Sequence, residues 1–268
     1  MAATFPIPRP LPMLAWVLAL GVIASGFAAA ADEAGAAPVA SPLKVHVLSG
    51  SNEYRSEESL RAWMEWLDEQ HAGQLELTAT WQEDRAGSIP EADLEAIAAA
   101  DVLLVFCRRW VLPEAQLETL RGFWREGGAV VAIRTASHAF DDNTNREFDR
   151  EVLGGHYDGH GDDRLAPVSN KAERLPWGEP APDVTRWATS KLYKQDELAG
   201  DAQVWQTATA GDVGEQVVTW SLDPNRFGGR SFTTSLGTPD DFAAPGFHHF
   251  LLGAVMWVAD GQREAAEE

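Results

Sequence analysis

The chain is poor in cysteine and in basic residues, and each shortage excludes a class of protein. Cys107 is its only cysteine, so no intrachain disulfide can form and the fold must depend on its apolar core. This cysteine ends an apolar run, which favours a buried structural thiol over a nucleophile. Lysine and arginine together number 21 against 41 acidic residues, and the net charge of −20 repels nucleic acid and anionic membrane surfaces.

The first thirty residues form a segment of their own, with Arg9 as the single charge before Asp32. An apolar run from Leu11 to Phe27 leads into alanines at 28–31, which is the pattern of a secretory signal peptide with a small-residue cleavage site. The run is almost long enough to span a membrane, so an uncleaved anchor is the alternative. Residues 31–42 are rich in alanine and proline and predict a flexible linker. We therefore expect a signal peptide at 1–30 and an exported protein, periplasmic or secreted, without stable membrane contact after cleavage.

Apolar strands and amphipathic helices alternate through the next part of the chain. Strands are predicted at 43–49, 75–81, 101–107 and 129–134, and helices between them at 56–70, 90–100 and 113–126. The helix at 56–70 carries Leu60, Trp63, Met64 and Leu67 on one face. Such alternation is typical of a parallel sheet with helices on both faces.

The remainder of the chain is less regular at first and then apolar again. Residues 141–202 are rich in glycine, proline and aspartate, and we expect loops, short helices and a hairpin there. Three more strands and a closing helix follow, at 204–210, 216–222, 230–235 and 246–259. The sequence predicts one α/β domain over 43–262 and a disordered tail at 263–268.

Three polar loops follow predicted strands, at the edge where ligands bind in open parallel sheets. The loops are 50–55, 107–110 and 134–138. They hold groups that move protons or bind hydroxyls, namely Glu53, Tyr54, Arg55, Arg108, Arg109, Arg134, Ser137 and His138. Any one of these could be an ordinary loop residue. The set, with arginine at three adjacent strand ends of an acidic chain, predicts a site for oxygen-rich ligands or carboxylate partners.

A histidine-rich stretch lies just downstream of these loops. His156 and His160 are four residues apart with Asp158 between them, and together with His138 they could bind a divalent metal such as zinc. Neighbouring glycines do not suit a helix, so the spacing is a weak metal signal. A hydrogen-bonding or acid/base role for the histidines is the alternative.

Several motifs lie in order between about Lys44 and Ala259. They are GSNEYRSEESL at 50–60, IRTASHAF at 133–140, VLGGHYDGH at 152–160, KLYKQDEL at 191–198 and GGRSFTTSLGTPDDFAAPGFHHFLLGAVMWV at 228–258. Together they resemble the ThuA family, which is named for trehalose utilisation. The resemblance implies the class I glutamine amidotransferase-like fold, a flavodoxin-like three-layer sandwich with a mainly parallel central sheet. It also implies a role in disaccharide catabolism, on 3-keto sugar derivatives made by partner dehydrogenases.

The resemblance does not extend to the nucleophile of that superfamily, a cysteine in a Gly-x-Cys-x-Gly pattern after a central strand. The equivalent stretch here is 132–136, where Arg134 stands at the cysteine position. Cys107 belongs to a different strand. The sequence therefore does not support glutamine hydrolysis through a thiol, and we do not expect a glutamine amidotransferase.

The favoured hypothesis is a carbohydrate-active enzyme, a hydrolase, lyase or isomerase, that uses acid/base chemistry on a small-molecule carbohydrate. We assign catalysis to Glu53, Arg134, His138, Asp158 and His160, and substrate binding to Tyr54, Arg55, Arg109, Trp110 and Ser137. Trp110 would stack on a sugar ring, with packing beneath its loop as the alternative. Two other hypotheses stay open: a sugar-binding or scaffold protein without catalysis, and a serine hydrolase using Ser137 and His138, which no G-x-S-x-G pattern surrounds. The sequence also allows a homo-oligomer.

Overall fold

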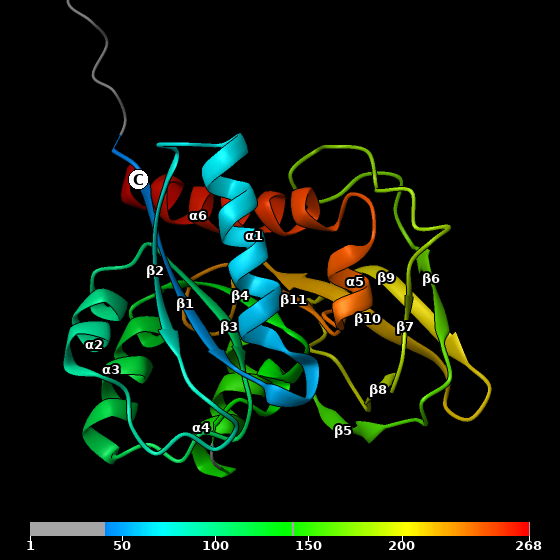
Figure 1. Cartoon of the computed structure of the whole chain (residues 1–268), viewed down its shortest axis with the longest axis horizontal. Coiled ribbons are helices and arrows are strands. Elements are labelled where there is room, and N and C mark those ends of the chain that lie inside the picture. Colours follow the sequence, from blue (N-terminus) through cyan, green and yellow to red (C-terminus); the bar gives the residue numbers. More distant parts are fainter. Residues whose placement is uncertain (1–40, 141, 268) are drawn as a thin grey trace, which may run out of the picture. The chain divides into compact units, whose positions relative to one another are not determined.

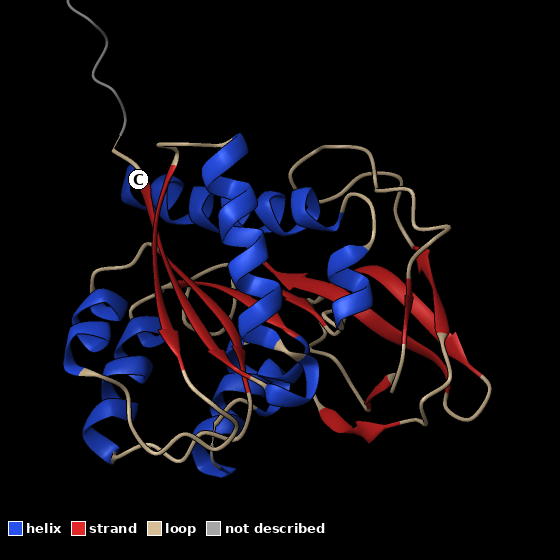
Figure 2. Cartoon of the chain, viewed as in Figure 1, coloured by secondary structure: helices blue, strands red, loops and turns tan. Residues whose placement is uncertain are grey.

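A nine-stranded sheet organises residues 41–140 and 142–267, which are the residues that the computed structural model describes (Figures 1 and 2). Its strand order is β2-β1-β3-β4-β11-β10-β9-β6-β7. The predicted signal peptide at 1–30 and the predicted linker as far as residue 40 lie outside the described residues. Within the described residues, no helix is long and apolar enough to cross a membrane.

Five neighbouring strands pair in parallel, and the first four come from the first half of the chain. They are β1 (Leu43–Gly50), β2 (Leu75–Trp81), β3 (Val102–Cys107), β4 (Ala129–Ile133) and β11 (Ser231–Thr234). β3 and β4 are buried along their whole length, as their continuous apolar sequences predict for strands covered on both faces. Cys107 is fully buried at the end of β3, and burial raises the pKa of its thiol, which confirms the predicted buried thiol.

The other half of the sheet is antiparallel, so the sheet is mixed where the sequence predicted a mainly parallel one. The strands here are β10 (Gly214–Leu222), β9 (Gln203–Ala210), β6 (Ala166–Asn170) and β7 (Ala188–Thr189). β9 and β10 are joined by a short turn, and a connection of that length allows only antiparallel pairing. Two short strands, β5 (Tyr157–His160) and β8 (Tyr193–Gln195), form a separate antiparallel pair.

Helices cover both faces of the parallel strands (Figure 1). α1 (Ser56–Gln70) and α6 (Phe247–Glu267) lie on one face, where Trp63 and Phe250 join a single apolar core with β1. α2 (Glu91–Ala98) and α3 (Glu114–Arg125) lie on the other face, where Leu120 packs in a second core with β3. α6 continues well past its predicted end at residue 259 and takes in most of the stretch predicted as a disordered tail.

Candidate functional site

The carboxyl ends of β1, β2, β3 and β4 lie at one edge of the sheet because these strands are parallel. Backbone hydrogen bonds join the loops that follow them. The amide of Arg85 donates to the carbonyl of Arg108 at 2.9 Å, and the amide of Arg109 donates to the carbonyl of His138, also at 2.9 Å. Loops far apart in the sequence therefore form one continuous rim.

Five basic residues at this edge and in the loop between β7 and β8 have a left-handed backbone. Their φ angles are 50° at Arg55, 59° at Arg85, 53° at Arg109, 48° at Arg134 and 47° at Lys191. Every non-glycine residue with a positive φ in the described part of the chain belongs to this set. A residue in this conformation costs about 1–3 kcal/mol, and such strain concentrates at functional sites. The rim is thus the candidate site.

Arg134 is the first residue of a 3-10 turn, η2 (Arg134–His138), and only 2% of it is exposed. Its guanidinium donates to the carbonyl oxygens of Ser235 and Ser190, both at 2.7 Å, and to Oγ1 of Thr189 at 3.1 Å. Arg134, which was predicted to be catalytic, therefore joins β4 to the far half of the sheet. These hydrogen bonds of its guanidinium are made to other parts of the protein.

The chain has three tyrosines, and all of them lie around Arg134 and His138. The Cζ atom of Arg134 lies 4.1 Å from the ring centroid of Tyr54 and 4.8 Å from that of Tyr193. The His138 ring stacks on Tyr157 with centroids 4.5 Å apart, and Tyr157 lies 4.8 Å from Tyr193. Burial raises the pKa of both Tyr157 and Tyr193, so their hydroxyls stay neutral hydrogen-bond donors. The sequence prediction missed these two, although the scarcity of tyrosine was a usable signal.

His138 is held in a neutral state. Burial lowers its pKa, and the charges of Arg109 and Arg108 lower it further, to about 3. Its Nδ1 atom lies 3.1 Å from Oγ of Ser137, whose hydroxyl donates to the carbonyl of Arg134 at 3.4 Å. A serine hydroxyl has one proton, so both contacts together require Nδ1–H of His138 to donate to Ser137. This tautomer leaves the lone pair on Nε2, and His138 is then a proton acceptor.

A cavity of about 620 Å³ opens beside His138. The loops after β2, β3 and β4 contribute to its walls, together with α4 (Asp142–Glu147), the π-helical turn η3 (Phe148–Val152) and the start of β5. His138, Asn145, Asp149, His156 and Tyr157 supply much of its polar lining, beside four arginines. This cavity is where ligand and titratable side chains can meet.

Asp149 is a second titratable group of the cavity. It lies in η3, only 6% of it is exposed, and π-helical turns occur frequently at functional sites. Its Oδ2 atom accepts the amide of Tyr157 at 3.1 Å, whereas its Oδ1 atom has no hydrogen-bond partner among the described residues. A Cβ at Gly155 would lie 2.8 Å from that Oδ1 atom, so a larger residue there would displace the Asp149 side chain. Burial raises the pKa of Asp149 to about 6, which makes it a proton donor close to neutral pH.

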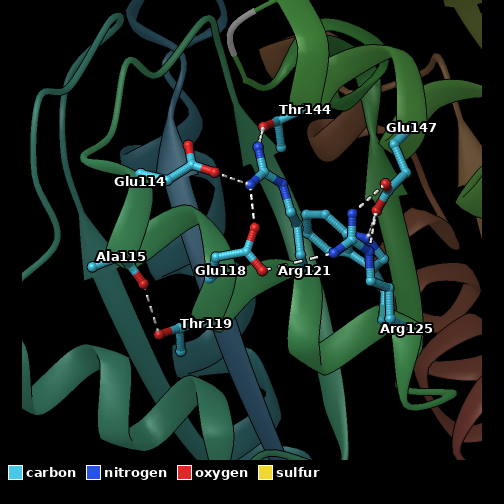
Figure 3. Close-up of polar contacts among 9 residues, drawn as sticks. Glu114, Ala115, Glu118, Thr119, Arg121, Arg125, Thr144 and Glu147 are labelled. Carbon is cyan, nitrogen blue, oxygen red and sulfur yellow. Dashed lines mark hydrogen bonds and ion pairs between the residues drawn. The ribbon is translucent and has the colours of Figure 1, made fainter.

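A hydrogen bond and an ion pair fix the α4 wall of the cavity against α3 (Figure 3). Arg121 donates to Oγ1 of Thr144 at 2.5 Å, and Arg125 pairs with Glu147 at 2.6 Å. Arg121 is itself held within α3 by Glu114, at 2.6 Å, and by Glu118. The short helix α4 is therefore held in place by its neighbour.

Glu53, predicted to be catalytic, links the first loop to the loop between β7 and β8. Its carboxylate accepts from Nζ of Lys191 at 2.5 Å and lies 3.7 Å from Arg108. Burial alone would raise the pKa of Glu53, but the Lys191 bond and the Arg108 charge outweigh it and lower the pKa. Glu53 therefore stays ionised beside His138, whose pKa its charge raises slightly against the arginines.

The short strand β5 places the predicted residues Asp158 and His160 outside the cavity. Side chains alternate between the two faces of a strand. Tyr157 is half-buried and faces the cavity, whereas Asp158 and His160 are exposed. Asp158 pairs with Lys194 at 3.3 Å and lines no wall of the cavity.

The three histidines predicted as metal ligands do not gather around a common point. Nε2 of His156 lies 2.6 Å from the Arg150 guanidinium, and Nδ1 of His160 lies 2.6 Å from the carbonyl of Gly161. Among the residues that the structure describes, no group of three histidine, cysteine, aspartate or glutamate side chains could hold a metal ion. Zinc binding stays a prediction.

Three further predicted binding residues lie apart from the cavity. Arg55 is exposed, bonds Glu58, and lines a neighbouring cavity of about 930 Å³. Trp110 is fully buried and donates to the carbonyl of Glu83 at 3.0 Å, so it packs beneath the loops as the alternative had it. Ser137 is 3% exposed and contacts His138 without lining the cavity.

The chain is similar to known proteins over nearly all of its described part. A family model named ThuA, trehalose utilisation, matches residues 44–258. The structure of a ThuA-like protein from Bacteroides uniformis has a TM-score of 0.61 at 17% identity, covering 84% of this chain and 94% of that one. A ThuA-like protein from Parabacteroides merdae has a TM-score of 0.60 at 17% identity, covering 82% of this chain and 91% of that one.

A more distant similarity is to one part of a larger enzyme. A β-galactosidase from Rahnella has a TM-score of 0.51 at 15% identity, covering 81% of this chain but 31% of that one. No curated protein sequence matches the chain. At these identities the structural similarities concern the fold alone.

Proposed function

Because the chain belongs to the ThuA family, which is described by trehalose utilisation, we propose that it acts in glycoside catabolism on a sugar or a 3-keto-sugar derivative. The observation that carries the proposal is a cavity that a neutral histidine and a buried carboxyl group line together. The chemistry is acid/base catalysis without a cysteine nucleophile, since Cys107 is buried in β3 and Arg134 follows β4.

His138 and Asp149 have the properties of an acid/base pair. Their surroundings move their pKa values in opposite directions, to about 3 for the histidine and about 6 for the aspartate. Opposed shifts of this kind mark the acid and the base of an active site. His138 would take a proton from a carbon or hydroxyl next to the sugar carbonyl. Asp149 in its protonated form, with the neutral phenol of Tyr157, would donate to the oxygen on which negative charge develops.

A sugar-binding protein without catalysis is the second candidate. The observation that favours it is the pKa of about 3 at His138, because an imidazole with so low a pKa is a weak general base in the ligand-free protein. In that case His138, Asp149 and Tyr157 would only hydrogen-bond the sugar.

The test is an assay of the full chain with glucosides, 3-keto-glucosides and trehalose, with and without added divalent metals. We expect turnover of at least one keto-glucoside, and losses of about 10²–10⁴-fold in kcat for His138→Asn and Asp149→Asn. Asp68→Asn, which changes an exposed carboxylate on α1, is the matched control and should keep full activity. Binding by calorimetry without any turnover would select the second candidate.

Two further properties belong to the proposal. Export is supported by the N-terminal pattern of an apolar run followed by alanines, and sequencing the N-terminus of the mature protein from a cell fraction tests it. A flavodoxin-like core is supported by the order of the parallel strands, β2-β1-β3-β4-β11, which corresponds to the 2-1-3-4-5 order of such sheets.

A further inference from the structure

The cavity gathers positive charge in a strongly acidic protein. Four of its lining residues are arginines, Arg85, Arg109, Arg146 and Arg150, and among the residues that the structure describes a single carboxyl group, that of Asp149, lines it with them. None of the four arginines forms an ion pair with a carboxylate among the described residues. In the same region Arg108, Arg121 and Arg125 all do, so the four cavity arginines differ from these neighbours in having no carboxylate partner among the described residues.

Two of these arginines have a backbone conformation that is energetically unfavourable for a non-glycine residue. Arg85 and Arg109 are exposed, have φ angles of 59° and 53°, and are fixed by the backbone bonds of the rim. A left-handed arginine costs about 1–3 kcal/mol, and neither side chain forms a hydrogen bond or an ion pair with a described residue that would offset that cost. Contact with a bound group would offset it. Guanidinium forks match the oxygens of carboxylates and phosphates, which they bind through two parallel hydrogen bonds.

A carboxyl oxygen of the lining residue Asp149 also lacks a hydrogen-bond partner among the described residues. The Oδ1 atom of Asp149 is buried without a hydrogen bond, although a buried polar atom left unpaired is costly. Tyr157 beside it carries a neutral hydroxyl. A hydroxyl-bearing ring in the cavity would lie against Asp149 and Tyr157, where the Tyr157 hydroxyl can hydrogen-bond it, beside the four arginines that share the lining.

We propose that the cavity binds a carbohydrate that carries an anionic group, a carboxylate or a phosphate, which the four arginines hold while the sugar hydroxyls face Asp149 and Tyr157. This inference rests on the proposed carbohydrate function and names the class of its substrate. The anionic group would lie beside Arg109, whose charge acts on His138, and so within the same cavity as the acid/base pair.

The test is calorimetric titration of the full chain with glucose, glucuronate, glucose 6-phosphate and inorganic phosphate. We expect glucuronate or glucose 6-phosphate to bind at least tenfold more tightly than glucose, and the tighter of the two identifies the anionic group. Arg109→Gln and Arg146→Gln should each weaken that ligand at least tenfold and leave glucose unchanged. Arg186→Gln, an exposed arginine outside the cavity, removes the same charge and should change neither. Added salt should weaken the charged ligands alone.

The outcomes distinguish a failure of the anionic ligand class from a failure of the proposed carbohydrate function. Equal affinity for charged and neutral sugars, or full affinity in both cavity variants, overturns the anionic class and leaves the carbohydrate function standing. Phosphate binding that Arg109→Gln abolishes, without binding of any sugar, supports the anion site and overturns the carbohydrate function. Circular dichroism and thermal melting of each variant confirm that it is folded.

Discussion

Replacement of the buried Arg134 by methionine is expected to destabilise the protein strongly. The guanidinium is 2% exposed and donates to two main-chain carbonyls, those of Ser235 and Ser190, at 2.7 Å. Methionine fills much of the same space and keeps the apolar contact with the tyrosine rings, but it donates no hydrogen bond. Arg134→Met therefore leaves the buried carbonyl of Ser235 and the part-buried carbonyl of Ser190 without this donor.

The magnitude follows from those two acceptors. A buried carbonyl left without its donor costs about 1–3 kcal/mol and a part-buried one costs less, so we expect the free energy of unfolding to fall by about 3–4 kcal/mol. With a urea dependence of about 2–3 kcal/mol per molar, the unfolding midpoint should move down by about 1.5 M. Equilibrium unfolding in urea, followed by tryptophan fluorescence and by circular dichroism together, measures it.

Arg55→Met provides the matched control. Arg55 has the same left-handed backbone, with φ of 50° against 48°, but its side chain is 58% exposed and bonds Glu58 in the helix that follows it. We expect its loss to stay below about 1 kcal/mol, as for exposed ion pairs. Equal midpoints for the two variants would refute the claim that the Arg134 hydrogen bonds stabilise the junction between the two halves of the sheet.

Two other predictions concern acid and metals. Burial lowers the pKa of His46 to about 4 while Thr78 and Thr80 hold its ring nitrogens. The unfolded chain takes up that proton near pH 6.5, so the contribution of His46 to stability is full above pH 6.5 and falls by about 3 kcal/mol towards pH 4. Urea unfolding across this range should show that the free energy of unfolding depends less steeply on pH in His46→Gln than in the unchanged protein. The same pH dependence in both proteins would contradict the prediction. Because Arg150 engages His156, we also expect a chelator to leave the melting temperature unchanged; a fall that zinc restores would show a metal site.

The sequence predicted the parallel half of the fold well because its signals are local. The strand at 75–81 and the helix at 56–70 have the predicted bounds, since alternating side chains and apolar residues spaced three and four apart determine them without reference to the rest of the chain. The antiparallel half depends on pairing between distant segments. β6 hydrogen-bonds to β9 across more than thirty residues, and β7 has two residues, too few for a period to be visible.

The candidate site was predicted where it depends on strand ends and missed elsewhere. Tyr54, Arg109 and His138 follow apolar strands, whose parallel pairing brings their ends together. Asp149 and Tyr193 come from the aperiodic stretch, where no pattern indicates which side chain faces inward. Asp158 was chosen over Tyr157 because the strand β5, whose alternation exposes the aspartate, was not predicted.

The rim of hydrogen-bonded loops constrains how this protein can change its specificity. The amide of Arg85 donates to the carbonyl of Arg108 in the loop after β3, and the amide of Arg109 in that loop donates to the carbonyl of His138 after β4. Each loop therefore depends on its neighbour for a backbone hydrogen bond. A one-residue insertion in any of them would break bonds in its neighbour as well. New ligands are therefore more easily accommodated by exchanging side chains on a fixed frame than by lengthening loops. A designer of variants should hold these loop lengths constant and vary only the residues that line the cavity.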